Sequence, residues 1–223
     1  MKQTNFKGVF EQKKRKGKSI YTRNLTPGRR YYDEALFKEK DYEYREWNPK
    51  KSKLGAAILK GVKEIGINSN QAVLYLGAST GTTVSHVSDI VGKDGIIFAV
   101  EFAPRVTREL VFVAEARKNI APILADANHP ETYSDKVCQA DTIYMDIAQK
   151  NQAEIFLKNI DMFLKPGGTA LLALKARSVD VTARPKEIFQ KVRTELQKHL
   201  KLIDFKELAP FELDHCMFVC KKK

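Results

Sequence analysis

Two lysines, an aspartate and a histidine stand where apolar runs give way to polar residues, and these residue types can move a proton or stabilise developing charge. Asp146 directly follows the apolar run "TIYM", and Lys175 directly follows "TALLAL". Lys53 opens a helical pattern, and His215 opens the run "CMFV". Each also has an ordinary explanation: a lysine at a strand end is usually solvated, an aspartate is often a helix cap, and a lone histidine is more often structural. Their chemistry depends on whether the fold brings them together.

A turn of small residues indicates a cofactor site. The stretch "GASTGTTVSHV", residues 77–87, follows the apolar run "AVLYL". Glycines at a strand-to-helix turn let the backbone approach a ligand closely. The stretch lacks the lysine of a phosphate-binding Walker loop, and it is not the GxGxxG of a dinucleotide-binding turn.

Two acidic residues favour a cofactor that contains adenosine. Glu101 ends the next strand, 20 residues after Gly81, where a carboxylate can hydrogen-bond ribose hydroxyls. Asp126 ends the third strand, within reach of an adenine amino group, although an Asx turn or cap explains it equally well. NAD and S-adenosylmethionine both contain adenosine. The missing third glycine and the antiparallel last strand that the pattern predicts favour S-adenosylmethionine.

The cysteines do not indicate a metal site. Cys138, Cys216 and Cys220 form neither a disulfide set nor a CxxC pair. A zinc site built on His215, Cys216 and Cys220 would lack a fourth ligand and suitable spacing. We therefore expect no metal and three buried thiols.

Residues 1–52 are predicted to form a small, basic, β-rich N-terminal domain. "NFKGVF" and "SIYTRNL" flank a charged stretch with a glycine and predict a hairpin. "YEYREW" alternates aromatic and charged residues, which is typical of a half-buried strand. A sheet this small is marginal alone, so we expect it to pack on residues 53–223.

Residues 53–223 alternate apolar strands with amphipathic helices. Ser52 is the expected N-cap of a first helix, and further helices are expected from Pro104 and Pro185. One face of the first helix is predicted to carry Leu54, Ala57, Ile58, Val62 and Ile65. Strands are expected at "AVLYL", "IIFAV", "APILA", "DTIYM" and "TALLAL". The last two runs, "KLIDFKEL" and "HCMFVCKK", are close enough to form a hairpin, which makes the last strand antiparallel and places it at or near the sheet edge.

This alternation predicts an α/β fold with a mostly parallel sheet and helices on both faces. Ligands of such sheets bind at the carboxyl ends of the strands. Asp146 and Lys175 end strands at that rim. The helix start at Lys53 and the start of the antiparallel strand at His215 face the same rim, so the four polar residues are predicted to meet there.

The charge balance indicates an acidic partner. The chain has a formal net charge of +12. Residues 1–53 hold 16 Lys/Arg against 7 Asp/Glu, a balance of +9, whereas residues 54–223 hold 23 against 20. Nucleic acid is the foremost candidate, with a solvated basic face as the alternative. No apolar run approaches membrane-spanning length and the start "MKQTNFKG" has no hydrophobic signal region, so we expect an untargeted cytoplasmic protein without a membrane partner.

Six stretches carry a resemblance to a known family. They are "YREWNPKKSKLGAAILKG", "VLYLGASTGTTVSHVSDIVG", "VEFAPR", "YMDIAQKNQ", "LALKARSVDVT" and "ELDHCMFV". In order and over essentially the whole chain, they resemble fibrillarins, in particular the archaeal form, because no glycine–arginine-rich tract is present. The resemblance implies a class I S-adenosylmethionine-dependent methyltransferase with a Rossmann-like sheet, which modifies ribose 2′-hydroxyls of ribosomal and transfer RNA.

The resemblance also implies roles for individual residues. Cofactor contacts are implied for Gly77, Gly81, Thr82, Thr83, Glu101, Phe102, Asp126, Ala127, Asp146, Ile147, Ala148 and Gln149. Glu101 and Phe102 would hold ribose and adenine, and residues 146–149 would flank the methionine end. The family's Lys-Asp-Lys-His tetrad falls on the four residues that topology brings together: Lys53, Asp146, Lys175 and His215.

The implied reaction is an in-line displacement of the sulfonium methyl group by a ribose oxygen. A lysine can accept the hydroxyl proton only if its pKa falls from about 10.4 towards neutrality. Lys175 is our candidate base or oxyanion stabiliser, with Lys53 as a nearby cation, Asp146 orienting Lys175 and His215 completing the network. Which lysine takes the proton stays open at this point. An NAD-dependent oxidoreductase and a non-catalytic RNA-binding scaffold are the rival hypotheses.

The sequence contains no recognisable RNA-reading module. The resemblance implies that target choice comes from a box C/D guide RNA, organised by a kink-turn-binding ribosomal-type protein, with a Nop-family scaffold protein tethering the methyltransferase to it.

Overall fold

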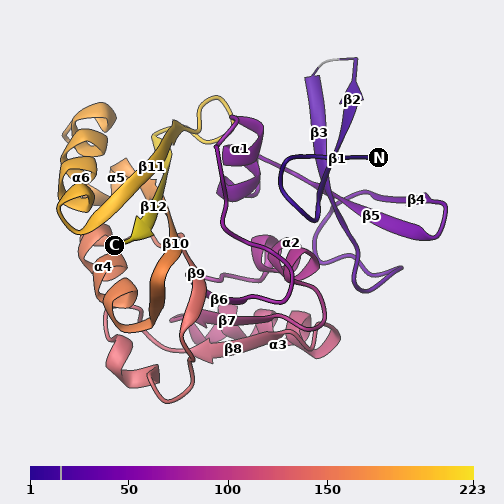
Figure 1. The fold of residues 1–223 in the computed structure, drawn as a ribbon, viewed down its shortest axis with the longest axis horizontal. Coiled ribbons are helices and arrows are strands. Elements are labelled where there is room, and N and C mark those ends of the chain that lie inside the picture. The colour runs from indigo at the N-terminus through magenta and orange to yellow at the C-terminus, as the bar shows by residue number, and fades with distance from the viewer. Residues whose placement is uncertain (16) are drawn as a thin grey trace.

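The structure is a computed structural model that describes residues 1–15 and 17–223. Its N-terminal part is an antiparallel five-stranded sheet in the order β1-β2-β3-β5-β4 (Figure 1). The predicted hairpin is formed by β2 (Val9–Lys14) and β3 (Gly17–Arg23), and the predicted half-buried strand is β5 (Tyr42–Trp47). β1 (Lys2–Gln3) and β4 (Leu36–Glu39) complete the sheet. Both expected elements are therefore confirmed.

A second sheet of seven strands follows, in the order β11-β12-β10-β9-β6-β7-β8. Its strands are β6 (Ala72–Leu76), β7 (Ile96–Glu101), β8 (Ile120–Leu124), β9 (Ala140–Met145), β10 (Leu164–Lys175), β11 (Leu200–Glu207) and β12 (His215–Lys222). β6 to β10 pair in parallel, whereas β12 runs antiparallel to both β10 and β11. This confirms the predicted α/β sheet with an antiparallel last strand, one place in from the edge.

Helices cover both faces of the large sheet (Figure 1). They are α1 (Lys53–Leu59), α2 (Thr82–Val91), α3 (Pro104–Ala116), α4 (Gln152–Phe163), α5 (Ala176–Val179) and α6 (Pro185–His199), with a short 3-10 helix at Pro130–Tyr133. Side chains of β6 alternate between two cores, because successive strand residues point to opposite faces. Val73 and Tyr75 pack with α1, α2 and α3, and Leu74 and Leu76 pack with α4 and α6.

The first helix is shorter than the pattern predicts. α1 ends at Leu59, because Gly61 adopts a left-handed φ of 74° and the Gly61 and Val62 amides donate to the Ile58 and Ala57 carbonyls. This is the Schellman arrangement that ends helices at glycine. Val62 and Ile65 are still buried in the same core, but outside the helix.

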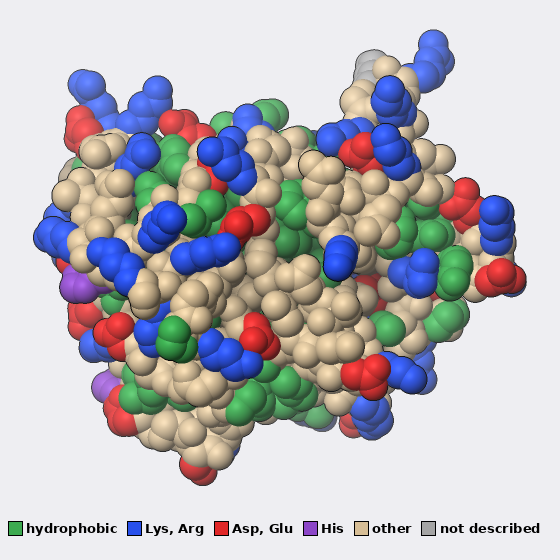
Figure 2. Space-filling view, viewed as in Figure 1, with side chains coloured by type: hydrophobic (Ala, Val, Ile, Leu, Met, Phe, Trp, Pro, Cys, Tyr) green, Lys and Arg blue, Asp and Glu red, His purple; other side chains and the backbone are tan. Residues whose placement is uncertain are grey.

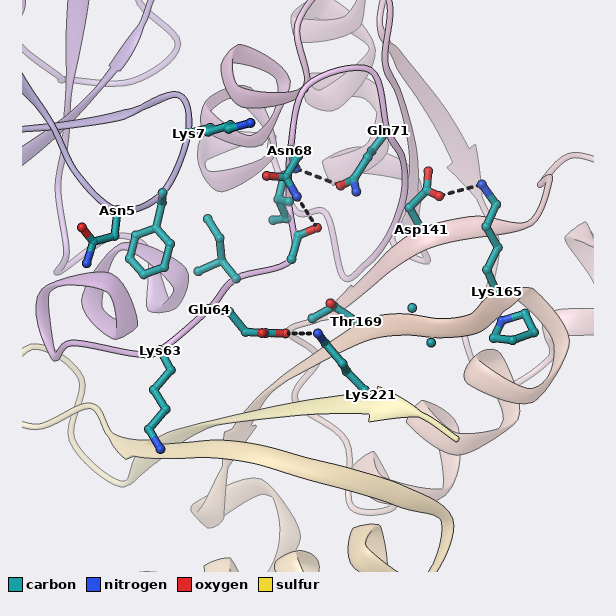
Figure 3. Close-up of a pocket in the computed structure, with 17 residues that line it drawn as sticks. Asn5, Lys7, Lys63, Glu64, Asn68, Gln71, Asp141, Lys165, Thr169 and Lys221 are labelled. Atoms are coloured by element: carbon teal, nitrogen blue, oxygen red, sulfur yellow. Dashed lines mark hydrogen bonds and ion pairs between the residues drawn. The ribbon is translucent and has the colours of Figure 1, made fainter.

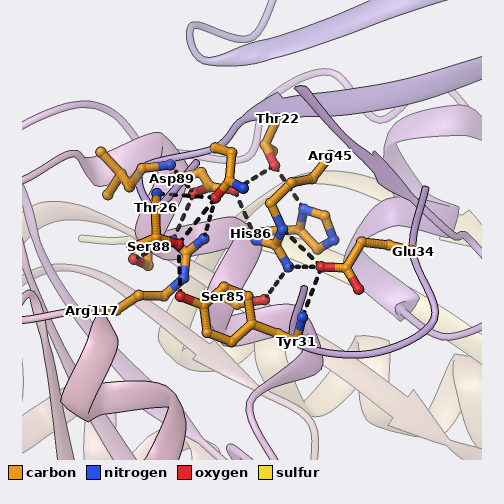
Figure 4. A network of polar contacts seen from close by, with 12 residues as sticks. Thr22, Thr26, Tyr31, Glu34, Arg45, Ser85, His86, Ser88, Asp89 and Arg117 are labelled. Carbon is orange, nitrogen blue, oxygen red and sulfur yellow. Dashed lines mark hydrogen bonds and ion pairs between the residues drawn. The ribbon is translucent and has the colours of Figure 1, made fainter. Parts of the chain in front are cut away.

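A buried ionic network joins the two sheets (Figure 4). Arg45 of β5 donates to Glu34 at 2.8 Å and to Asp89 of α2 at 2.9 Å, and Arg117 donates to the other Asp89 oxygen at 2.6 Å. All four side chains are fully buried. Two carboxylates offset two guanidinium groups, so the charges are balanced where water cannot reach them.

His86 of α2 ties the same interface together. The Thr22 hydroxyl donates to Asp89 at 2.7 Å, so it accepts from the His86 Nδ1–H, also at 2.7 Å. The Tyr32 hydroxyl lies 2.6 Å from the other ring nitrogen, and the Trp47 ring stacks on the imidazole at a centroid distance of 4.8 Å. Burial holds the pKa of His86 well below its ordinary value, so the ring is neutral.

The division into residues 1–52 and 53–223 stays a proposal, because one hydrophobic core runs across that boundary.

No helix within the described ranges is both long and apolar enough to cross a membrane.

Candidate functional site

The start of α1 brings Lys53 to the end of β9. Ser52 caps α1 by accepting from the Gly55 amide at 3.2 Å, and the buried Thr83 hydroxyl donates to the same oxygen at 3.0 Å. The Lys53 ammonium then reaches Asp146, with N–O distances of 2.9 and 3.0 Å to the two carboxylate oxygens. Lys53 and Asp146, which the sequence places at one rim, therefore form an ion pair there.

Lys175 and His215 face each other across β10 and β12. Both backbone groups of Lys175 bond to Gln152, on the side away from β12. The pair is therefore a cross-strand pair without hydrogen bonds between its backbones, which is the register that brings side chains closest. Lys175 is exposed, and its ammonium has no ion pair or hydrogen bond within the described residues.

His215 is the first residue of β12 and is largely buried. Its side chain is only 10% exposed, and its Nδ1 lies 2.5 Å from the Leu213 carbonyl. Burial lowers the pKa of His215, the Leu213 hydrogen bond opposes this, and the charge of Lys53 lowers it further. With Nδ1 donating to Leu213, Nε2 of the neutral ring is left as an acceptor.

The structure thus brings the four predicted residues to one rim, in two pairs. One expectation differs from what is found. The Asp146 carboxylate is engaged by Lys53 and not by Lys175. The reason is geometric, because the capped start of α1 points Lys53 directly at the end of β9, whereas Lys175 continues into α5 beside β12.

A cleft of about 240 Å³ adjoins this rim, lined by nine of the twelve residues expected to bind the cofactor and by Ser79, Val100 and Ala125. The nine are Gly77, Glu101, Phe102, Asp126, Ala127, Asp146, Ile147, Ala148 and Gln149. Asp146 therefore belongs both to the cleft and to the tetrad. This shared residue joins the cleft to the tetrad.

Glu101 is held rigidly at the end of β7. Its carboxylate accepts from the backbone amides of Ser79 at 2.9 Å and of Phe102 and Ala103 at 3.1 Å each, and it is almost completely buried. Phe102 beside it is 65% exposed. A fixed carboxylate next to an open aromatic ring suits a ribose and a stacked base.

The far wall of the cleft is fixed by an Asx turn. Asp126 accepts from the Asn128 amide at 2.9 Å, and the Asn128 side chain donates to Gln149 at 2.6 Å. The Asx turn that the sequence left open for Asp126 is therefore present, and Asp126 lines the cleft as well. The two loops that would face adenine and methionine are tied to each other.

The two glycines of the turn serve different purposes. Gly77 has a φ of 81°, and a Cβ there would lie 2.2 Å from the Asp146 carbonyl oxygen, so glycine lets the two loops touch. Gly81 also has a positive φ, but a Cβ there would press on Leu110 and Val113 of α3. Gly81, Thr82 and Thr83 do not line the cleft, and their expected cofactor contact stays a prediction.

Sequence reasoning missed Ser79 of the cleft wall. It adopts a φ of 51°, and its amide is one of the three that hold Glu101. Its place inside the "GASTG" turn was the available signal.

A larger cleft of about 510 Å³ opens at the opposite end of the sheet (Figure 3). Asp141 at the start of β9 and Lys165 at the start of β10 line it and pair at 2.6 Å, and Lys221 near the end of β12 pairs with Glu64 at 3.1 Å. The cleft therefore lies at the amino ends of the parallel strands. Lys7 and Lys63 also line it, but none of the residues expected at the site does, so size alone does not make it the site.

None of the three cysteines lines the 240 Å³ cleft. Cys216 and Cys220 are buried in the core, and burial raises the pKa of Cys220 to about 12. Cys138 is exposed, so the expectation that all three thiols are buried is wrong. It lies in the charged loop before β9, where nothing covers it. Over residues 1–15 and 17–223, no three His, Cys, Asp or Glu residues group as a metal site would require.

Comparison with known proteins gives the family. The profile of the fibrillarin family matches residues 1–223. The chain belongs to the fibrillarin family. A fibrillarin-like rRNA/tRNA 2′-O-methyltransferase of Pyrococcus horikoshii is 48% identical over 223 residues, which cover 100% of this chain and 98% of that protein. The resemblance carried by the sequence motifs is thereby confirmed.

Two solved fibrillarins share the fold. The Aeropyrum pernix fibrillarin, solved in complex with natively bound S-adenosyl-L-methionine, has a TM-score of 0.89 at 45% identity, over 96% of this chain and 94% of that one. A fibrillarin solved as a fibrillarin/Nop5p complex has a TM-score of 0.88 at 38% identity, over 99% of this chain and 100% of that one. Fibrillarin structure is thus retained over nearly all of the present chain.

Proposed function

We propose that this chain transfers a methyl group from S-adenosyl-L-methionine to a ribose 2′-hydroxyl of ribosomal or transfer RNA. The observation that carries the proposal is the position of Asp146, which lines the cofactor cleft and is paired with Lys53 of the tetrad. The relatives support it, since one is a fibrillarin-like rRNA/tRNA 2′-O-methyltransferase and another holds S-adenosyl-L-methionine.

The cleft residues fit the proposed cofactor. Backbone amides occupy three of the roughly four acceptor positions of the Glu101 carboxylate and hold it in place, which leaves Oε2 one position for a ribose hydroxyl. Phe102 offers a face for adenine, and Asp126 reaches its amino group. Ile147 and Ala148 are apolar walls for the methionine end, and Gln149 closes it. Gly81, Thr82 and Thr83 are proposed to act from behind the turn, through the start of α2.

When bound, S-adenosyl-L-methionine supplies an electrophilic methyl group. The residues of the chain must then orient the ribose and take up its hydroxyl proton, because that oxygen is a weak nucleophile while protonated. Lys175 is proposed as the base or as the cation that stabilises the oxyanion. His215, held neutral, offers Nε2 to position it, and the Lys53–Asp146 pair supplies a fixed dipole at the methionine end. General-base help contributes roughly 10²–10⁴-fold.

A calorimetric titration tests the cofactor assignment. S-adenosyl-L-methionine should bind and NAD should not. Binding of NAD alone would support the oxidoreductase hypothesis. Binding of neither would support the RNA-binding scaffold hypothesis.

The proposal includes a guide-directed assembly. Lys and Arg side chains are spread over the face shown in Figure 2, including the projecting β2–β3 hairpin. Scattered charge binds RNA backbone but does not select one nucleotide. We propose that a box C/D guide RNA pairs with the target, that a kink-turn-binding ribosomal-type protein organises this RNA, and that a Nop-family scaffold carries the methyltransferase. The related fibrillarin/Nop5p complex supports the last contact.

Mapping 2′-O-methyl groups on a target RNA tests the assembly. The isolated chain should methylate poorly, and guide RNA with both partner proteins should restore methylation at one ribose. Site-specific methylation by the isolated chain would contradict the guide requirement.

A further inference from the structure

We propose that Gln152 is a positioning residue for methyl transfer, which fixes Lys175 against the cofactor loop without touching either substrate. The inference rests on the proposed function, since it assigns a partner to Lys175, the proposed base or oxyanion stabiliser. Gln152 is the first residue of α4 and is completely buried. It does not line the 240 Å³ cleft.

The carboxamide of Gln152 hydrogen-bonds to both backbone groups of Lys175, and we call this pair of bonds the grip. Its Oε1 accepts from the Lys175 amide at 3.1 Å, and its Nε2 donates to the Lys175 carbonyl at 3.2 Å and to the Gln149 carbonyl at 2.8 Å. Three of its hydrogen-bonding positions are therefore used, and all are directed at backbone.

The sheet explains why Lys175 needs this grip. β10 pairs with β9 only as far as Leu172 and Met145, and β10 then runs on to Lys175. Beyond Met145 the chain turns towards β6, since the Asp146 amide donates to the Leu76 carbonyl at 2.9 Å. The Lys175 amide and carbonyl point to the side where β9 no longer pairs with β10, so no strand supplies them with hydrogen bonds. An unpaired backbone group near the interior is costly. The Gln152 amide takes the place of that strand.

The third hydrogen bond, to the Gln149 carbonyl, links Lys175 to the cofactor cleft. Gln149 lines the cofactor cleft, whereas Lys175 ends the neighbouring strand at the tetrad. One planar amide therefore sets the distance between the loop at the methionine end and the proposed base. A displacement on the order of 1 Å can cost about 10²-fold in rate. The effect should appear in the transfer step and much less in cofactor binding.

The test compares Gln152→Met, which keeps the volume and loses all three bonds, with the wild type in the guided assembly. We expect the single-turnover rate of methyl transfer to fall at least about tenfold, while the dissociation constant of S-adenosyl-L-methionine changes by less than about threefold. Asn119→Leu is the matched control. Asn119 is also a buried carboxamide: its Nδ2 donates to the Ser88 and Gly92 carbonyls, and its Oδ1 accepts from the Ser88 hydroxyl. It directly precedes β8, at the end of the sheet opposite the rim, so its loss should leave the rate unchanged.

A double-mutant comparison separates positioning from general structural damage. In a Lys175→Ala background, Gln152→Met should lower the residual rate no further, because the group it positions is gone. If the methionine variant does not fold, Gln152→Glu takes its place, since glutamate keeps the acceptor for the Lys175 amide and loses both donors. It should likewise lower the transfer rate and leave the dissociation constant of S-adenosyl-L-methionine nearly unchanged. A rate within threefold of wild type, or a further loss of rate in the Lys175→Ala background, would overturn the proposal.

Hydrogen exchange tests the grip without reference to activity. The Lys175 amide proton should exchange at least about tenfold faster in Gln152→Met than in the wild type, and Asn119→Leu should leave it unchanged. Unchanged exchange in Gln152→Met would overturn the positioning role. A wild-type assembly that transfers no methyl group, with exchange accelerated as expected, would contradict the proposed function and keep the structural role of Gln152.

Discussion

The Lys53 ammonium contacts both oxygens of the Asp146 carboxylate, at 2.9 and 3.0 Å, although the two residues are 93 positions apart. Their side chains are 22% and 20% exposed, so the pair is largely shielded from solvent. The contact joins the start of α1 to the end of β9, and Asp146 also forms part of the cofactor cleft. Under the proposed function, the aspartate connects cofactor binding to methyl transfer.

Asp146→Ala should impair both functions. The variant removes a cleft wall and leaves the Lys53 charge without its partner, so we expect weaker binding of S-adenosyl-L-methionine together with loss of most methyl transfer. Calorimetry and single-turnover rates measure the two effects separately. A folded Asp146→Ala protein with wild-type transfer would contradict the role of this pair.

Glu101→Ala should weaken S-adenosyl-L-methionine binding by at least about 1.5 kcal/mol, the loss of a charge-assisted hydrogen bond. The loss is expected to be larger than for an ordinary hydrogen bond because the carboxylate also holds the Ser79, Phe102 and Ala103 amides in place. Exposed Glu154 on α4 provides a control, and Glu154→Ala should bind normally. An unchanged dissociation constant in folded Glu101→Ala would remove Glu101 from the cofactor site.

The buried network between the sheets should dominate stability. Asp89→Asn leaves the Arg45 and Arg117 charges without a carboxylate between them, and breaking a buried pair costs about 3–5 kcal/mol. Lys158→Ala breaks the exposed pair with Glu154, which is worth about 0.5 kcal/mol or less. Chemical denaturation measures both. If Asp89→Asn were as stable as Lys158→Ala, the network would not hold the two sheets together.

The same interface should respond to pH through His86. The folded protein keeps this ring neutral, whereas the unfolded chain protonates it near its ordinary pKa of about 6.5. The folded pKa is the lower one, so the stabilisation is present above about pH 6.5 and is lost as the pH falls, at up to about 1.4 kcal/mol per pH unit.

Denaturation between pH 7.5 and 5 checks the sign. His86→Gln should flatten the pH dependence of the free energy of unfolding, because glutamine does not titrate. His129→Gln, at an exposed histidine, should leave it unchanged. If the free energy of unfolding changed equally with pH in wild type and His86→Gln, His86 would not be a source of the pH dependence.

Sequence patterns were sufficient to predict the strands of the large sheet and the meeting of the tetrad, because apolar runs set those strands and topology sets the rim. They did not predict β1 and β4, which are short and mostly exposed. They could not show that Asp146 pairs with Lys53 and not with Lys175, since that depends on the angle at which Ser52 starts α1. Nor could they show the buried network. Arg45 stands in the alternating pattern "YEYREW", and Asp89 stands in the mostly apolar pattern "VSHVSDIV". Neither pattern indicates a partner for the charge, and the packing of the small sheet on α2 is what buries the two residues together.

The most direct test of the account is to follow a labelled methyl group from S-adenosyl-L-methionine into a guided target RNA in a single turnover, with wild type, Lys175→Ala and the surface control Lys158→Ala. The account predicts that wild type and Lys158→Ala place the label on one ribose 2′-oxygen. Lys175→Ala should bind S-adenosyl-L-methionine within about threefold of wild type but transfer the label at least about 100-fold more slowly. Label recovered on a nucleobase of the RNA, or near-normal transfer by Lys175→Ala, would contradict the account.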